Sequence, residues 1–182
     1  MVEKVVVAID VEHSAASSAA VDWAVMRARK TDISIELTTV IEAAWAPHGG
    51  EPIESATPYA EALEQYETSI QLRTPTTEVW TVARRGKPST ALVALSTDVD
   101  LLVVGANPTT PLAGITHATT ALQVAGHSAC PTIVVPAGWM PRGGPVVVGW
   151  TDDPTAHAAT VFAAEEATRA GIPLRIVTAW TL

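Results

Sequence analysis

Short apolar runs alternate with helix-patterned segments over the first 136 residues. The apolar runs lie at residues 4–10, 33–41, 78–83, 100–105 and 131–136, and Val, Ile and Leu dominate them, as is typical of strands. The segments between them, at 14–30, 54–72, 88–98 and 117–128, are predicted helices. Parallel strands need crossover connections. The alternation therefore predicts an α/β domain, an open doubly wound five-stranded parallel sheet with helices on both faces.

The C-terminal part of the chain repeats the beginning of this pattern. Residues 144–180 follow the order of residues 3–41: a Val-rich strand, an Asp/Thr turn, an Ala-rich helix and a second strand. We therefore expect a first domain at 1–138, a turn-rich linker at 139–145 and an incomplete β-α-β second repeat at 146–182. Such a unit cannot bury both faces of its strands alone. It must lie against the first domain, pair with another chain or belong to a longer product. Its end on a strand suggests truncation of a tandem ancestor or of the gene product.

Charge and cysteine content limit the classes of function. The formal net charge is −8, which argues against nucleic acid or an anionic membrane as a partner. A single cysteine, Cys130, and an N-terminus that enters a strand directly favour a cytoplasmic protein. The five histidines show no metal-ligand spacing, and no set of nucleophile, base and orienting group stands out. We therefore predict neither a metal site nor catalytic residues.

Candidate binding residues follow from the fold class. Ligands of doubly wound sheets bind at the carboxyl ends of strands where the strand order reverses, which points to Asp10, Val40 and the loop that begins at Gly105. Asp10 either accepts hydrogen bonds from a ribose or base, or caps the following helix. The loop has a second glycine, Gly114, but Pro108 has no N–H to offer a phosphate.

Residues Leu101 to Pro141 include no Asp, Glu, Lys or Arg, so no cation within this segment neutralises a triphosphate. The hydroxyls of Thr119 and Thr120, and a helix predicted to begin near His117, remain to attract an anion. The sequence therefore predicts a weak anion site or none.

Several local patterns resemble the universal stress protein family. "VVVAIDVEHSAASSAAVDWA" is similar to that family's opening "VVxVDGSxxSxxAxxWA". "RGKPSTALVALSTDVDLLVVG" is similar to "GxPAxxLLxxAxxxxxDLLVVG", and "AGHSACPTIVVP" to the closing "HHAxCPVLVVP". The likeness covers residues 2–136 and resumes at 145 for a second copy, an arrangement familiar in actinobacterial members of the family.

The resemblance implies an adenine-nucleotide-binding module without established catalytic chemistry, used in stress regulation and commonly dimeric. In ATP-binding members an Asp and a Val that match Asp10 and Val40 hold the base and ribose, and a loop G-x2-G-x9-G-[S/T] holds the phosphates. Counted from Gly105, the second glycine is Pro108, the third is Ala118 and the hydroxyl residue is Thr119. Two of the three glycines are therefore replaced.

Two hypotheses about function follow from this comparison. The favoured one is a non-catalytic regulatory or scaffold protein with a degenerate loop and little or no tight ATP binding. The alternative is a regulatory protein that binds ATP or AMP, so no cofactor is certain and these two are the candidates. The expected partners are a second copy, paired through the edge strand Thr132–Val135, and a protein partner. The residues of the degenerate site would be Asp10, Val40, Gly105, Pro108, Gly114, Ala118, Thr119 and Thr120.

Overall fold

The computed structural model describes residues 2–10, 14–42, 57–107 and 120–179. The chain divides into two compact units, Met1–Trp139 and Met140–Leu182, which we call the first and the second unit. Among the described helices, none combines the length and apolar character needed to cross a bilayer.

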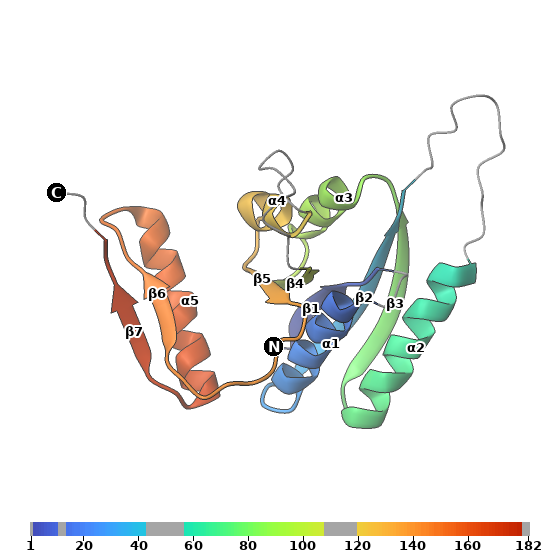
Figure 1. The fold of residues 1–182 in the computed structure, drawn as a ribbon, viewed down its shortest axis with the longest axis horizontal. Coiled ribbons are helices and arrows are strands. Elements are labelled where there is room, and N and C mark those ends of the chain that lie inside the picture. The colour runs from blue at the N-terminus through green and yellow to red at the C-terminus, as the bar shows by residue number, and fades with distance from the viewer. Residues whose placement is uncertain (1, 11–13, 43–56, 108–119, 180–182) are drawn as a thin grey trace. The chain divides into compact units, whose positions relative to one another are not determined.

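The first unit is a five-stranded parallel sheet with strand order β3-β2-β1-β4-β5 (Figure 1). Strands β1 and β4 are neighbours, so the strand order reverses between them. The fold class predicted from the sequence is confirmed. In chain order the elements are β1 (Glu3–Ala8), α1 (Ala15–Ala28), β2 (Ile33–Ile41), α2 (Thr57–Arg73), β3 (Glu78–Arg85), α3 (Pro88–Leu95), β4 (Leu101–Ala106), α4 (Thr120–His127) and β5 (Thr132–Pro136).

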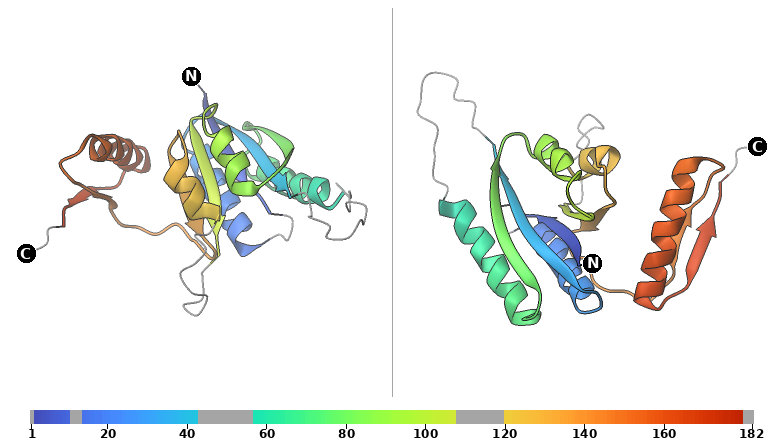
Figure 2. Two further views of the ribbon diagram at one scale, coloured as in Figure 1. Left: turned by 90° about the horizontal axis from the view of Figure 1, so that it is seen from above. Right: turned by 180° about the vertical axis from the view of Figure 1, so that it is seen from behind.

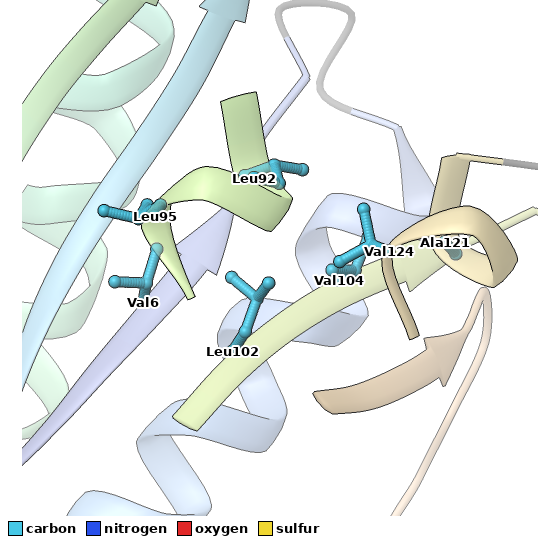
Figure 3. Packing of buried hydrophobic residues seen from close by; sticks show 7 residues of the cluster. All are labelled: Val6, Leu92, Leu95, Leu102, Val104, Ala121 and Val124. Atoms are coloured by element: carbon cyan, nitrogen blue, oxygen red, sulfur yellow. The ribbon is translucent and has the colours of Figure 1, made fainter. Parts of the chain in front are cut away.

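Helices cover both faces of this sheet (Figures 1 and 2). Helix α1 packs on β1, β4 and β5, and α2 packs on β2 and β3. On the opposite face, α3 and α4 contribute to one hydrophobic cluster with the inner strands (Figure 3). The cluster consists of Val6, Leu92, Leu95, Leu102, Val104, Ala121 and Val124. The central strands are buried on both faces, which explains their continuous apolar sequence.

Local sequence signals fix several helix ends. Ser14 is the N-cap of α1, because its hydroxyl oxygen accepts from the backbone N–H of Ser17 at 3.1 Å. Pro88 stands at the first position of α3, where a missing N–H costs nothing. Helix α4 is described from Thr120, and the predicted start near His117 lies outside the described residues.

The second unit is a β-α-β element made of β6 (Val146–Gly149), α5 (Pro154–Ala170) and β7 (Leu174–Val177), with β6 and β7 parallel. Asp153 caps α5 by accepting from the backbone N–H of Thr155 at 2.7 Å. Hydrogen bonds from the hydroxyls of Thr151 and Thr155 and from nearby backbone N–H groups hold the pKa of Asp153 well below its usual range. Gly171 ends the helix in the left-handed region, with φ of 68°.

The two β-α-β elements share one pairing register. Val5 pairs with Ile35 in the first unit, and Val146 pairs with Leu174 in the second. Four residues further along, the N–H of Ile9 donates to the carbonyl of Thr38, and the N–H of Trp150 donates to that of Val177, each at 2.8 Å. This shared register supports the interpretation of the second unit as a partial copy of the first.

Burial differs sharply between the two β-α-β elements. Val6 is 0% exposed in β1, whereas Val147, its counterpart in β6, is 57% exposed. In the first unit Val6 is covered by residues of β4 and α3, and the second unit contributes no equivalent of these elements among its described residues.

Candidate functional site

A pocket of about 510 Å³ opens at the carboxyl ends of β1, β2 and β4 in the first unit. The point where the strand order reverses, between β1 and β4, lies within it. The first turns of α1, α2, α3 and α4 complete its walls. Of the eight residues predicted for the site, the four that the structure describes all line this pocket: Asp10, Val40, Gly105 and Thr120.

The Asp10 carboxylate is held in place by the N-cap of α1. Its Oδ1 accepts from the N–H of Ser14 at 3.1 Å, and its Oδ2 accepts from the hydroxyl of Ser14 at 2.5 Å. The N–H of Asp10 in turn donates to the hydroxyl of Ser17 at 3.0 Å. Ser14, not Asp10, is the N-cap of the helix, so the structure does not bear out the capping role weighed for Asp10. Each carboxylate oxygen keeps a lone pair for a further donor, so the group is fixed in position and still able to accept from a ligand.

Small apolar side chains form part of the pocket wall. Ala8 of β1, Val40 of β2 and Ala106 of β4 are partly buried and pack against the hydrophobic cluster beneath α3 and α4. Figure 3 shows Val104 of that cluster close to α4, the helix that begins at the pocket. A flat apolar group placed here would cover surface that is continuous with the core.

Gly105 lines the pocket, but its missing side chain serves the packing of α1. A Cβ added at this position would lie 2.4 Å from the carbonyl oxygen of Ala16 and 2.5 Å from its carbonyl carbon. Only glycine allows the first turn of α1 to approach β4 so closely. The family resemblance implies a phosphate-loop role for Gly105, whereas its contact with Ala16 is a packing requirement that is independent of any ligand.

The charges that line the pocket are acidic. Asp10 and Glu42 are among its lining residues, and no lysine or arginine is found among the lining residues that the structure describes. Glu42 comes directly after β2 and is exposed.

The neighbouring cation Arg84 is already paired with a buried acid. It lies opposite Val40 in the register of β2 and β3, and its Nη2 donates to Oε1 of Glu36 at 2.7 Å. Its Nε donates to the hydroxyl of Thr38 at 3.2 Å. The side chain of Glu36 is only 4% exposed and also accepts from Nε1 of Trp80 at 3.3 Å, so Arg84 serves to neutralise it.

Four residues of the predicted site belong to the segment between β4 and α4. Pro108, Gly114, Ala118 and Thr119 lie outside the described residues. The chain that holds them connects Asn107 to Thr120, and both of these line the pocket.

The lining residues that sequence reasoning missed include Glu42, Asn107 and Tyr59. Glu42 directly follows the predicted strand 33–41, and Asn107 comes two residues after the predicted strand 100–105. Both therefore lie at carboxyl ends of strands, where the fold places ligands, and this signal could have found them. No comparable signal marks Tyr59, which lies near the start of α2.

The described residues contain no group of three or more His, Cys, Asp or Glu that could hold a metal ion. Cys130 lies away from the pocket, partly buried against the hydrophobic cluster, and burial raises the pKa of its thiol. A thiol with a raised pKa in apolar surroundings behaves as a small hydrophobic group.

A parallel α/β sheet with a pocket at its switch point places the first unit in the doubly wound class of α/β domains, in which ligands bind at such points. Residues 1–136 match the model of the Universal stress protein family, and this chain belongs to that family. A search of curated protein sequences gives no match.

Solved structures of universal stress proteins share the fold. One in complex with cAMP is 23% identical, with 75% of this chain and 98% of that chain covered and a TM-score of 0.60. A family member from Arabidopsis thaliana with AMP bound is 18% identical, with 75% and 92% covered and a TM-score of 0.55. A universal stress protein from Archaeoglobus fulgidus DSM 4304 is 13% identical, with 98% of this chain and 67% of that chain covered and a TM-score of 0.72. At these identities the likeness concerns the fold.

Proposed function

We propose that this chain is a non-catalytic regulatory or scaffold member of the universal stress protein family that binds ATP weakly or not at all. The observation that carries the proposal is the charge of the pocket: Asp10 and Glu42 line it, and its described lining contains no lysine or arginine. A triphosphate would bring several negative charges to two carboxylates without a basic partner, an arrangement that disfavours binding.

Two further observations support weak ATP binding. The glycine pattern of ATP-binding members is interrupted by Pro108 and Ala118 in this sequence. The remaining first glycine, Gly105, is required by its contact with Ala16, so its presence is no sign of a phosphate site.

The alternative function is regulation through bound ATP or AMP. The relatives solved with cAMP and with AMP favour it, as do the position of Asp10 and the apolar wall at Val40. In this case the base and ribose would lie between β1 and β2, and the phosphates would point toward the residues after Gly105.

Calorimetry separates the two functions. The full chain is purified, a sample is denatured and analysed for released adenine nucleotide, and the native protein is titrated with ATP and AMP. We expect no released nucleotide and no micromolar affinity for ATP, and micromolar ATP binding would refute the proposal. If ATP does bind, Asp10→Ala should abolish binding, whereas Asp98→Ala, an exposed acid outside the pocket, should leave it unchanged.

We further propose that two copies pair through β5. This strand is an edge of the sheet, so one side of its backbone is open to another strand. A lysine in place of Ile133 would bring two like charges together across a symmetric strand pair. Light scattering should then give half the mass of the unmodified protein, and an unchanged dimer mass would exclude this edge.

A further inference from the structure

The charged residues in the described lining of the pocket are both acidic. Asp10 follows β1 and Glu42 follows β2, each at the carboxyl end of its strand. No lysine or arginine is found among the described lining residues. The described lining therefore presents two carboxylates and no cationic side chain to a ligand.

Three cations lie near lining residues in sequence or in strand register without lining the pocket themselves. Arg84 is bound to Glu36, as described above. Arg85 is exposed at the end of β3, and Lys87 is exposed directly before the lining residue Pro88. Because none of the three lines the pocket, the charge of the described lining is that of its two carboxylates.

The uncharged part of the wall suits a nucleoside. Ala8, Val40 and Ala106 offer an apolar surface to a flat base, and Asp10 has lone pairs free for sugar hydroxyls. Asn107 and Thr120 add polar contacts at the far side. The volume of about 510 Å³ falls within the usual range for small-molecule pockets.

We infer that the pocket selects a nucleoside that carries no phosphate over the corresponding mono- and triphosphates. This inference rests on the proposed function and names the ligand class of the same pocket. The apolar wall and the Asp10 carboxylate bind the base and sugar, and the acidic lining repels each phosphate charge. Affinity should therefore fall in the order adenosine, AMP, ATP.

The test is a calorimetric titration of the full chain with adenosine, AMP and ATP at low and high salt. We expect adenosine to bind at least tenfold more tightly than AMP, and AMP more tightly than ATP. Because salt screens repulsion between charges, AMP binding should strengthen as salt rises, whereas binding to a basic phosphate site would weaken.

A charge variant tests the cause of the selectivity. Glu42→Gln removes one lining carboxylate and should reduce the adenosine-to-AMP affinity ratio at least threefold at low salt. Glu64→Gln removes an exposed acid of α2 that does not line the pocket, and it should leave the ratio unchanged.

The outcomes distinguish this inference from the proposed function. Equal affinity for adenosine and AMP with weak ATP binding, or no binding of any of the three, would overturn the inference and leave the proposed function standing. Micromolar ATP binding, at least as tight as that of adenosine, would overturn both. An unchanged ratio in Glu42→Gln would refute the electrostatic cause and, with it, the inference.

Discussion

Replacing Gly105 with alanine tests the packing role that the structure gives to this residue. The added Cβ would stand 2.4 Å from the carbonyl oxygen of Ala16, and ordinary van der Waals contacts begin at 3.4 Å. Either β4 or the first turn of α1 must therefore move by about 1 Å. The atoms that must move are backbone atoms next to a helix cap, where Ser14 holds both Ser17 and Asp10, so they relax poorly.

Overpacking a folded core costs about 1–3 kcal/mol, and contact with fixed backbone atoms places Gly105→Ala near the upper end. For a unit of this size, a loss of about 3 kcal/mol lowers the Tm by roughly 10 °C. Urea unfolding of the ligand-free protein, followed by tryptophan fluorescence and circular dichroism, measures the change.

Gly126→Ala is the matched control, because a Cβ at this position in α4 meets nothing within 4 Å. Alanine there should be neutral or stabilise by up to about 1 kcal/mol, since glycine disfavours helices. If the free energy of unfolding of Gly105→Ala lies within about 0.5 kcal/mol of that of the unmodified protein, the packing explanation is wrong. A role in ligand binding would then be the better explanation for this glycine.

Two other predictions concern the second unit. Val6→Ala should lower the free energy of unfolding, measured with urea, by about 2 kcal/mol. Val147→Ala changes the matching position, which is 57% exposed, and should lower it by less than about 0.5 kcal/mol. Equal losses would show that Val147 is buried in solution. The lowered pKa of Asp153 contributes stability that is complete above the ordinary Asp range, near pH 4, and is lost as the pH falls toward the folded value. A circular dichroism titration from pH 6 to pH 2 should therefore show a smaller loss of helix signal in Asp153→Asn than in the unmodified protein, and identical titrations would contradict this role of the cap.

The fold could be predicted because its signals are local. Val5, Val6 and Val7 are each 0% exposed. A run of three consecutive apolar residues predicts this burial on both faces of the strand. Ser14 is also a local signal, since a hydroxyl before an Ala-rich run is the usual start of a helix. Each strand and helix of the first unit could be predicted from its own residues, and the parallel sheet from the rule that parallel strands require crossover connections.

The site could be predicted only in part, because its details depend on contacts between distant residues. The role of Gly105 comes from Ala16, which is 89 positions away in the chain, and no pattern around residue 105 records that contact. The sequence fits a capping aspartate at position 10, and only the geometry of Ser14 shows that another residue is the helix cap. An acid such as Glu42 looks in sequence like any solvated surface residue until the pocket beside it is known.

The apolar wall of the pocket is also the upper surface of the hydrophobic cluster, since Ala8, Val40 and Ala106 pack directly on it. Amide hydrogens at the ends of β1 and β4 can exchange with solvent only when this part of the domain opens. An occupant that rests on these side chains is lost in every such opening, so it both slows exchange and raises the melting temperature. At a hundredfold excess over its Kd it adds about 2.7 kcal/mol to the free energy of unfolding. A melting-temperature screen thus detects any ligand of this pocket, whatever its chemistry, without knowing in advance what the ligand is.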